Sequence, residues 1–394
     1  MRVLFTTWAW PSHLYGMVPL AWACQAAGHD VVVASQPTLQ RTIAATGLTG
    51  VSVGADRDAE TMVRGYLLPA AAERGRSEPV SPRTGRGPRA LQMFLAHADA
   101  MLDELVEVAR QWSPDLIVYE PTAWAGPLAA QVVKVPAVRH LYGADLLVRA
   151  RQLLPELLAP LARRHGSAPV DPTAAPTIDP WPARLRLPGS RADLPMRHVP
   201  FNGPCQSLPP NTGSADRSAS RASRRRICVS WGHTIARVSP SRFIAGAVAK
   251  ALAAHAEVIL AVSADQHELL GPLPDGVRVL HDVPLRTILP GCDLLVSHGG
   301  AGSILTALDA GVPMLLVPQL PDHAAHAAAV LGAGCGAVLN RAEATPEQLR
   351  REAGSLLTDK AVADAVHEVR RDMHAQPGPA QLVPRLEQLA LDRV

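Results

Sequence analysis

The chain has 394 residues, of which 47% are hydrophobic, and its formal net charge is +3. This length and apolar content favour two domains, each with its own buried core. The small net charge and the lack of basic runs interleaved with aromatic residues argue against nucleic-acid binding. Five cysteines scattered without metal-ligand spacing predict neither a disulfide framework nor a metal site, so we expect a cytoplasmic protein.

The first half of the chain alternates short apolar runs with helical segments. Buried strands are predicted where those runs occur, at residues 3–7, 31–35, 115–119 and 137–140. The helix predicted over 14–27 ends at Gly28, because glycine accepts the left-handed cap conformation. Prolines interrupt the apolar character of this N-terminal region, so we expect neither a signal peptide nor a membrane span. The alternation predicts a doubly wound parallel sheet.

A second cycle of strands follows in the other half of the chain. Its strands are predicted at 227–230, 257–262, 277–280, 294–297 and 314–317, with a helix over 241–255. Residues 202–225 lack apolar periodicity and read as a linker, and the Arg-rich segment 72–90 reads as a loop. An amphipathic helix is predicted at 380–391. We therefore expect an N-terminal domain over 1–201, a linker over 202–225, a C-terminal domain over 226–378 and a final helix in 379–394 that packs back toward the N-terminal domain.

A glycine-rich turn carries the clearest chemical signal. Residues 296–303, Val-Ser-His-Gly-Gly-Ala-Gly-Ser, read as the end of a strand, a tight turn and the first turn of a helix. Unpaired backbone N–H groups and the positive end of the helix dipole converge there, which favours a phosphate or pyrophosphate. Asp322 and His323 follow the next strand, where they can reach the rest of such a ligand. A phosphate site beside a carboxylate predicts a phosphorylated sugar as ligand.

A histidine and a glutamate follow two strands of the first half. His13 lies in or just before the first turn of the first helix, where the helix dipole favours the neutral imidazole that can accept a proton. Glu120 ends the strand 115–119 and therefore belongs at the same edge of the sheet. A carboxylate behind a histidine fixes its tautomer and stabilises its charge. The alternatives are a capping histidine and a solvated loop carboxylate.

Taken in order, these motifs resemble a known family. The segment 298–303, then Ala-Leu-Asp-Ala-Gly-Val-Pro at 307–313, then Pro318 and Asp322, is similar to the donor-binding signature of inverting nucleotide-sugar glycosyltransferases of GT-B architecture. The resemblance is greatest to those that decorate antibiotic polyketides of the macrolide, enediyne and anthracycline types. The opening residues 1–22 are similar to the start of that family's acceptor domain. The resemblance spans most of the chain and implies two Rossmann-like doubly wound α/β domains that face each other across a cleft.

The resemblance also implies roles for individual residues. His13 would be the general base that deprotonates an acceptor hydroxyl, and Glu120 would be its partner, where the family usually has Asp. The pyrophosphate would be held by His298, Gly299, Gly300 and Ser303, with a further contact from Thr234. The backbone near Val283 would meet the nucleotide base, and Asp322 and His323 would bind sugar hydroxyls.

Two departures from the family pattern indicate the kind of donor. His323 stands where Gln is common and His326 replaces a common Asn, which favours a deoxysugar over ordinary glucose. The family's polyketide-decorating members imply a dTDP-linked donor, with a UDP-sugar as the alternative. No metal and no cofactor besides the nucleotide-sugar co-substrate is expected. Aromatic residues of the first half predict an apolar pocket for a hydrophobic, polyketide-like acceptor. These are Trp8, Trp10, Tyr15, Phe94, Trp124 and Tyr142.

Two other functions stay open from the sequence. A nucleotide-sugar epimerase or phosphorylase-like enzyme of the same fold would act without a lipophilic acceptor, and a non-catalytic partner protein would bind the donor without turnover. Some relatives need a cytochrome-P450-like activator protein, and the segment 72–90 is a candidate docking or lid segment for it. The sequence leaves open this partner, a homodimer, and an O-, N- or C-glycosidic linkage.

Overall fold

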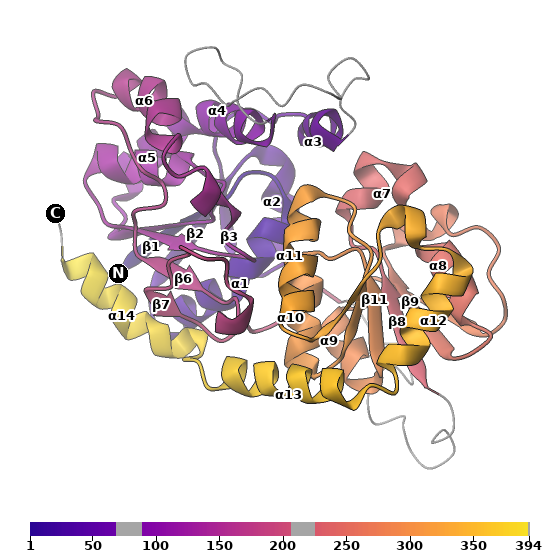
Figure 1. Ribbon diagram of the computed structural model, residues 1–394. Helices are drawn as coiled ribbons and strands as arrows, with labels where there is room; N and C mark the ends of the chain where they lie inside the picture. The colour runs from indigo at the N-terminus through magenta and orange to yellow at the C-terminus, as the bar shows by residue number, and fades with distance from the viewer. Residues whose placement is uncertain (68–88, 206–224, 393–394) are drawn as a thin grey trace. The chain divides into compact units, whose positions relative to one another are not determined.

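The computed structural model describes residues 1–67, 89–205 and 225–392, which form two compact α/β units (Figure 1). The first unit comprises Met1–Pro180, Pro188–Val199 and Pro377–Val394, and the second comprises Trp181–Leu187 and Pro200–Gln376. Most of the loop predicted over 72–90 and of the linker predicted over 202–225 lies outside the described residues.

The first unit contains a seven-stranded sheet in the order β3-β2-β1-β4-β5-β6-β7, and every strand pair in it is parallel. Its strands are β1 (Arg2–Thr6), β2 (Asp30–Ser35), β3 (Thr49–Ser52), β4 (Leu116–Tyr119), β5 (Ala137–His140), β6 (Thr177–Asp179) and β7 (Leu194–Pro195). Val3 of β1 pairs with Val31 on one side and with Leu116 on the other. This strand is central in the sheet, which explains why its Val3 and Leu4 side chains are fully buried.

Helices flank this sheet. They are α1 (Pro11–Ala26), α2 (Gln40–Ala44), α3 (Ala59–Leu67), α4 (Arg89–Trp112), α5 (Ala125–Val133), α6 (Leu154–Arg164) and α14 (Pro379–Leu391). Helix α1 begins three residues before the predicted start, because Pro11 occupies its first turn with a suitable fixed φ. Gly28 beyond its end has the expected positive φ, +84°. The final helix α14 packs on α1 and buries Leu382 and Leu386.

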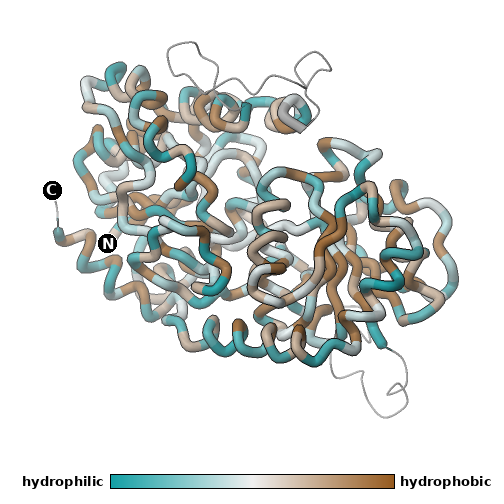
Figure 2. The backbone as a smooth tube through the Cα atoms, in the orientation of Figure 1, coloured by the Kyte–Doolittle hydropathy of each residue, from teal (hydrophilic) through white to brown (hydrophobic). Residues whose placement is uncertain are grey.

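The second unit contains a six-stranded parallel sheet in the order β10-β9-β8-β11-β12-β13. Its strands are β8 (Arg226–Ser230), β9 (Glu257–Val262), β10 (Val277–His281), β11 (Leu294–Ser297), β12 (Met314–Leu316) and β13 (Gly336–Val338). Figure 2 shows these strands as a hydrophobic centre. Because neighbouring parallel strands point the same way, the loops after β8, β11 and β12 share one edge of the sheet.

The helices of the second unit complete the predicted alternation. They are α7 (Thr234–Val238), α8 (Ala245–Leu252), α9 (Leu285–Ile288), α10 (Ala301–Ala310), α11 (Pro321–Gly332), α12 (Pro346–Leu356) and α13 (Lys360–His374). Helix α8 is shorter than the predicted 241–255, because Pro240–Arg242 form a separate 3-10 turn before it. The predicted fold class, two α/β units with doubly wound parallel sheets, is confirmed.

Candidate active site and donor site

The N-terminal candidate site lies at the carboxyl edge of the first sheet. Trp8 follows β1, His13 lies in the first turn of α1, and Glu120 comes directly after β4. The backbone N–H of His13 donates to the carbonyl of Trp10, which precedes the helix. The sequence argument about strand ends therefore predicted the correct neighbourhood for these side chains.

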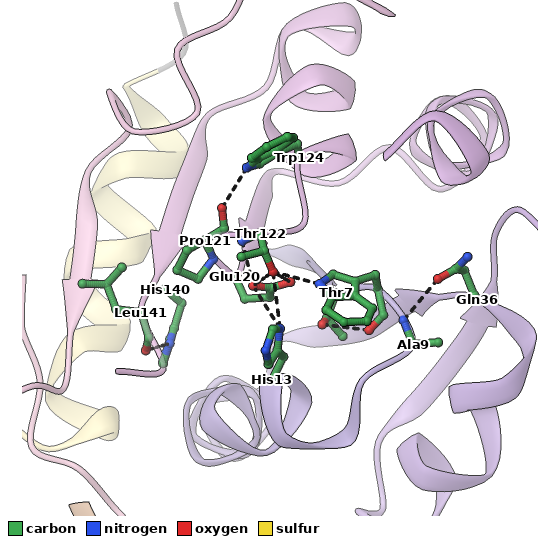
Figure 3. A network of polar contacts seen from close by, with 11 residues as sticks. Thr7, Ala9, His13, Gln36, Glu120, Pro121, Thr122, Trp124, His140 and Leu141 are labelled. Atoms are coloured by element: carbon green, nitrogen blue, oxygen red, sulfur yellow. Dashed lines mark hydrogen bonds and ion pairs between the residues drawn. The ribbon is translucent and has the colours of Figure 1, made fainter. Parts of the chain in front are cut away.

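His13, Glu120 and Thr122 form one hydrogen-bonded network (Figure 3). The Nδ1 atom of His13 lies 3.5 Å from Oε2 of Glu120 and 3.4 Å from the hydroxyl of Thr122. That hydroxyl lies 2.9 and 2.8 Å from the two carboxylate oxygens of Glu120, and the backbone N–H of Thr122 donates to Oε2 at 2.8 Å. Glu120 is fully buried, whereas the side chain of His13 is 11% exposed. The network thus presents the imidazole at the surface of the site with its carboxylate behind it.

The partners of Thr122 determine which imidazole nitrogen of His13 carries the proton. The indole N–H of Trp8 donates to the Thr122 hydroxyl at 2.8 Å, so this oxygen is already an acceptor. Its single hydrogen is directed to the carboxylate of Glu120, whose two oxygens accept. Nδ1 of His13 therefore faces acceptors and carries the hydrogen, which leaves Nε2 with a free lone pair. A neutral imidazole in this tautomer can act as a general base through Nε2.

Aromatic rings surround this histidine. The ring of Tyr142 stacks on it at a centroid distance of 4.1 Å, and Trp8 meets it edge-on at 5.1 Å. The indoles of Trp8 and Trp10 lie 5.3 Å apart, and Phe94 of α4 lies 6.3 Å from Trp8. These contacts bring together most of the rings predicted to bind the acceptor.

Two predicted acceptor residues remain, Trp124 and Tyr15. Trp124 meets Phe94 edge-on at 5.6 Å, and its indole N–H donates to the Pro121 carbonyl, which fixes the ring. Tyr15 is half-buried, two residues after His13 on α1. Sequence reasoning missed Thr122 and the buried His97, which lies 4.5 Å from Trp8. The signals available for them were the spacing of two residues from Glu120 and the position of His97 on the apolar face of α4.

The C-terminal candidate site lies at the start of α10. Gly300 is the N-cap of this helix and provides no side-chain cap, and the first turn contains no acidic residue. The backbone N–H groups in the first turn of α10 are therefore available to an anion. Gly299 has a φ of +89°, which lets the chain double back after β11. Ser303 is half-buried in the first turn of the helix.

Two glycines leave room for the ring of His298. A Cβ atom added to Gly300 would lie 2.6 Å from Nε2 of His298, and one added to Gly232, after β8, would lie 2.7 Å from its Cε1. Both distances are too short for real contacts, so the imidazole occupies space that only glycine leaves free. Gly299 approaches His323 in the same way, with a built Cβ 3.2 Å from its carbonyl oxygen.

Three buried histidines pack together behind the turn. His298 and His323 meet edge-on with centroids 4.7 Å apart, and Nδ1 of His326 lies 3.2 Å from the Gly299 carbonyl. Burial, reinforced by His323, holds the pKa of His298 well below its usual range, and burial lowers the pKa of His323 to about 4. These rings are therefore neutral near neutral pH. In the described part of the chain, no group of three or more His, Cys, Asp or Glu side chains is arranged to hold a metal ion.

The other predicted donor residues lie at the same edge of the sheet. Asp322 is in the first turn of α11, half-buried, and its Oδ2 lies 3.8 Å from Nε2 of His323. Thr234 begins α7 after β8, and Val283 follows β10 and is buried. The structure joins His298, Gly299, Gly300 and His323 directly, whereas Thr234 and Val283 share only the edge with them.

Comparison with solved structures identifies the class of fold. The crystal structure of the glycosyltransferase VinC in complex with dTDP is 32% identical, with a TM-score of 0.79, and the match covers 99% of this chain and 100% of that chain. VinC and this chain share two parallel-sheet α/β domains, the GT-B architecture.

Sequence comparisons identify the family. The family described as "Erythromycin biosynthesis protein CIII-like" matches with its N-terminal domain over residues 22–232 and its C-terminal domain over 246–389. The 10-deoxymethynolide desosaminyltransferase of Streptomyces venezuelae is 35% identical over 99% of this chain and 97% of its own length. The aclacinomycin-T 2-deoxy-L-fucose transferase of Streptomyces galilaeus is 34% identical over 100% and 97%.

The chain therefore belongs to the erythromycin biosynthesis protein CIII-like family, and it is an antibiotic-decorating glycosyltransferase, as its motifs predicted. No helix in the described ranges is long and apolar enough to span a membrane.

Proposed function

We propose that this enzyme transfers a deoxysugar from a dTDP-sugar to a hydroxyl of a hydrophobic, polyketide-like acceptor, with inversion at the anomeric carbon. The observation that carries the proposal is the hydrogen-bonded network that leaves Nε2 of His13 with a free lone pair. Two similar proteins support the choice of substrates: VinC was solved with dTDP, and one relative is a desosaminyltransferase of 10-deoxymethynolide.

In this mechanism the acceptor binds with its hydroxyl at Nε2 of His13. The imidazole removes the hydroxyl proton while the acceptor oxygen attacks the anomeric carbon from the face opposite the diphosphate. The new carbon–oxygen bond forms as the bond to the diphosphate breaks, and dTDP leaves. Glu120, which is buried against Nδ1, stabilises the imidazolium that forms.

In this mechanism the start of α10 binds the diphosphate of the donor. The diphosphate gains negative charge as it departs, and the uncapped N–H groups after Gly300 are placed to receive it. The neutral, buried ring of His298 supplies a further polar contact. On this proposal the reaction requires no metal ion and no cofactor besides the dTDP-sugar, for which a UDP-sugar is the alternative donor.

The test of the proposal is turnover with a dTDP-deoxysugar and a panel of macrolactone and anthracycline aglycones. A β-linked product from an α-linked donor is expected, and His13→Ala should abolish turnover while its dTDP affinity, measured by calorimetry, stays near the wild-type value. Retention of configuration, or full activity of the variant, would contradict the mechanism. A new donor sugar formed without any acceptor would instead identify an epimerase.

We further propose two partners from the family resemblance, a cytochrome-P450-like activator protein and a second copy of the chain. Activity assayed with and without such an activator, and the molar mass in solution measured by light scattering, test each partner separately. Full activity of the isolated monomer would exclude a requirement for either.

A further inference from the structure

Among the buried histidines of the first unit, His97 lies beside the proposed base and has no role in the mechanism above. His97 lies on α4 and is 1% exposed, three residues after Phe94 and therefore on the same face of the helix. Its ring lies 4.5 Å from the indole of Trp8, tilted by 34°. The same indole meets His13 edge-on at 5.1 Å. One tryptophan thus separates His97 from the proposed base.

Two backbone groups fix the orientation of the side-chain amide that faces His97. Nε2 of Gln36 donates to the carbonyl of Ala55 at 2.7 Å, and Oε1 accepts from the backbone N–H of Ala9 at 3.2 Å, a contact drawn in Figure 3. A carbonyl can only accept and a backbone N–H can only donate, so the reversed amide would lose both bonds. Oε1 of Gln36 is therefore the atom that lies 2.9 Å from Nδ1 of His97.

This orientation fixes the tautomer of His97. Because Oε1 of Gln36 only accepts, Nδ1 of His97 must carry the hydrogen. Burial, with smaller effects from Arg57 and His13, lowers the pKa of His97 to about 4, so the ring is neutral near neutral pH. A neutral imidazole has one N–H, so Nε2 of His97 presents a lone pair. That atom is buried and has no hydrogen-bond partner among the described residues.

An unpaired buried acceptor costs free energy in the ligand-free protein, so a ligand that supplies the missing donor gains affinity. A carbon atom at this position would avoid that cost, and the rest of the ring already packs on Trp8. Nε2 of His97 is therefore a hydrogen-bond acceptor without a donor. The Trp8 indole separates it from His13, at which the hydroxyl of the sugar acceptor would lie.

We propose that Nε2 of His97 accepts a hydrogen bond from a second hydroxyl of the sugar acceptor, while the hydroxyl to be glycosylated lies at His13. This inference rests on the proposed function and deepens it, because it names the acceptor class: hydrophobic molecules with two neighbouring hydroxyls. An acceptor with a methyl ether in place of the second hydroxyl leaves the lone pair unpaired and is bound less well.

The experiment compares two probes by calorimetry, 1,3-dihydroxynaphthalene and its monomethyl ether 3-methoxy-1-naphthol. The wild-type protein should bind the diol roughly tenfold more tightly, the value of one buried hydrogen bond. His97→Phe keeps an aromatic ring against Trp8 but removes the lone pair, so it should bind both probes equally. His97→Gln places a carbonyl oxygen near the same position and should restore part of the preference.

Met101→Leu is the matched control, because Met101 lies one turn further along the buried face of α4 and has no polar role. It should keep the wild-type preference. Thermal unfolding and dTDP affinity of each variant show that the protein remains folded.

Three results would each overturn the inference: equal affinity of the wild type for both probes, no binding of the diol, or a preference that persists in His97→Phe. Nitrogen-15 NMR of the ligand-free protein gives an independent test, since a hydrogen on Nε2 of His97 at pH 7 would also refute it. Sugar transfer without a diol preference would count against His97 alone. A diol preference without sugar transfer would count against the proposed function alone.

Discussion

Both units place histidines at the carboxyl edges of similar parallel sheets, but the surroundings of these histidines differ between the units. In the first unit His13 is partly exposed and backed by a buried carboxylate and a threonine hydroxyl. In the second unit His298 is buried against two glycines, and its Nδ1 has no hydrogen-bond partner among the described residues. A ring that must gain and lose a proton needs a counter-charge behind it. A ring that only contacts a phosphate needs close approach and a fixed neutral state.

The largest expected effect concerns stability in acid, where the two units should separate. Burial lowers the pKa of His233, His298, His323 and His326 in the second unit. The ordinary histidine pKa of the unfolded chain is about 6.5, and between this value and the lower pKa values of the folded protein the unfolded chain binds more protons than the folded one. The stabilisation from the neutral buried rings is therefore fully present above pH 6.5 and is lost as the pH falls. Each ring contributes a slope of at most about 1.4 kcal/mol per pH unit.

Hydrogen exchange from pH 7 to pH 4.5 should therefore show both units losing stability, and the second unit, with one more such histidine than the first, somewhat more steeply. In the first unit burial lowers the pKa of three histidines, His97, His140 and His198. Saturating dTDP should oppose the opening of the second unit. Equal slopes for both units would show that burial of these imidazoles does not govern acid stability.

The next effect concerns the carboxylate of the first unit. Glu120→Gln keeps the size of the side chain but removes the charge that stabilises the His13 imidazolium, so kcat should fall by roughly 10²–10³-fold with little change in dTDP affinity. Glu387→Gln is the matched control, because Glu387 also pairs with a histidine, His29, outside the site. A similar fall of kcat in both variants would remove Glu120 from the mechanism.

A smaller effect is expected from the backbone of the second unit. Gly300→Ala places a Cβ against Nε2 of His298, which must shift, so dTDP affinity measured by calorimetry should fall roughly 10- to 100-fold. Gly354→Ala lies in α12 of the same unit, where a Cβ also meets nothing within 4 Å, and should leave the affinity unchanged. If both variants bind dTDP normally, the nucleotide is bound elsewhere.

The smallest effect concerns the hydroxyl that joins Trp8, His13 and Glu120. Thr122→Val keeps the shape of the side chain but leaves the Trp8 indole N–H without its acceptor. We expect kcat to fall by roughly 3- to 10-fold, about one neutral hydrogen bond. Thr46→Val, which removes a hydroxyl bonded only to nearby backbone of the same unit, serves as the control. No change in kcat for Thr122→Val would show that Glu120 alone orients His13.

Much of the fold could be predicted from the sequence because its central strands are continuous apolar runs. The short peripheral strands β3, β6, β7 and β13 were not predicted. Strand β3 is Thr-Gly-Val-Ser and mostly exposed, and β7 is two residues long, so neither carries a hydrophobic pattern. Their place comes from pairing with neighbours already in the sheet, which a local pattern does not contain.

The same contrast, between what a local sequence pattern contains and what tertiary packing sets, applies to the candidate site. The approach of Glu120 to His13 follows from the strand ends, which sequence reasoning can locate. The role of Thr122 as a shared acceptor depends on the indole of Trp8, which lies 114 residues away along the chain. The tautomer of His97 likewise depends on Gln36, 61 residues away. Such side-chain relations are set by tertiary packing.

The path of the chain has a practical consequence for engineering. Residues 181–187 belong to the second unit, where Trp181 packs on His326, while 188–199 return to the first unit and 377–392 join it as a late segment. A hybrid enzyme made by cutting once near residue 200 would remove α14 from the first unit and Trp181 from α11 of the second. Exchange of units between relatives should therefore use four junctions, after residues 180, 187, 199 and 376, so that each transplanted unit keeps its own sequence-distant segments.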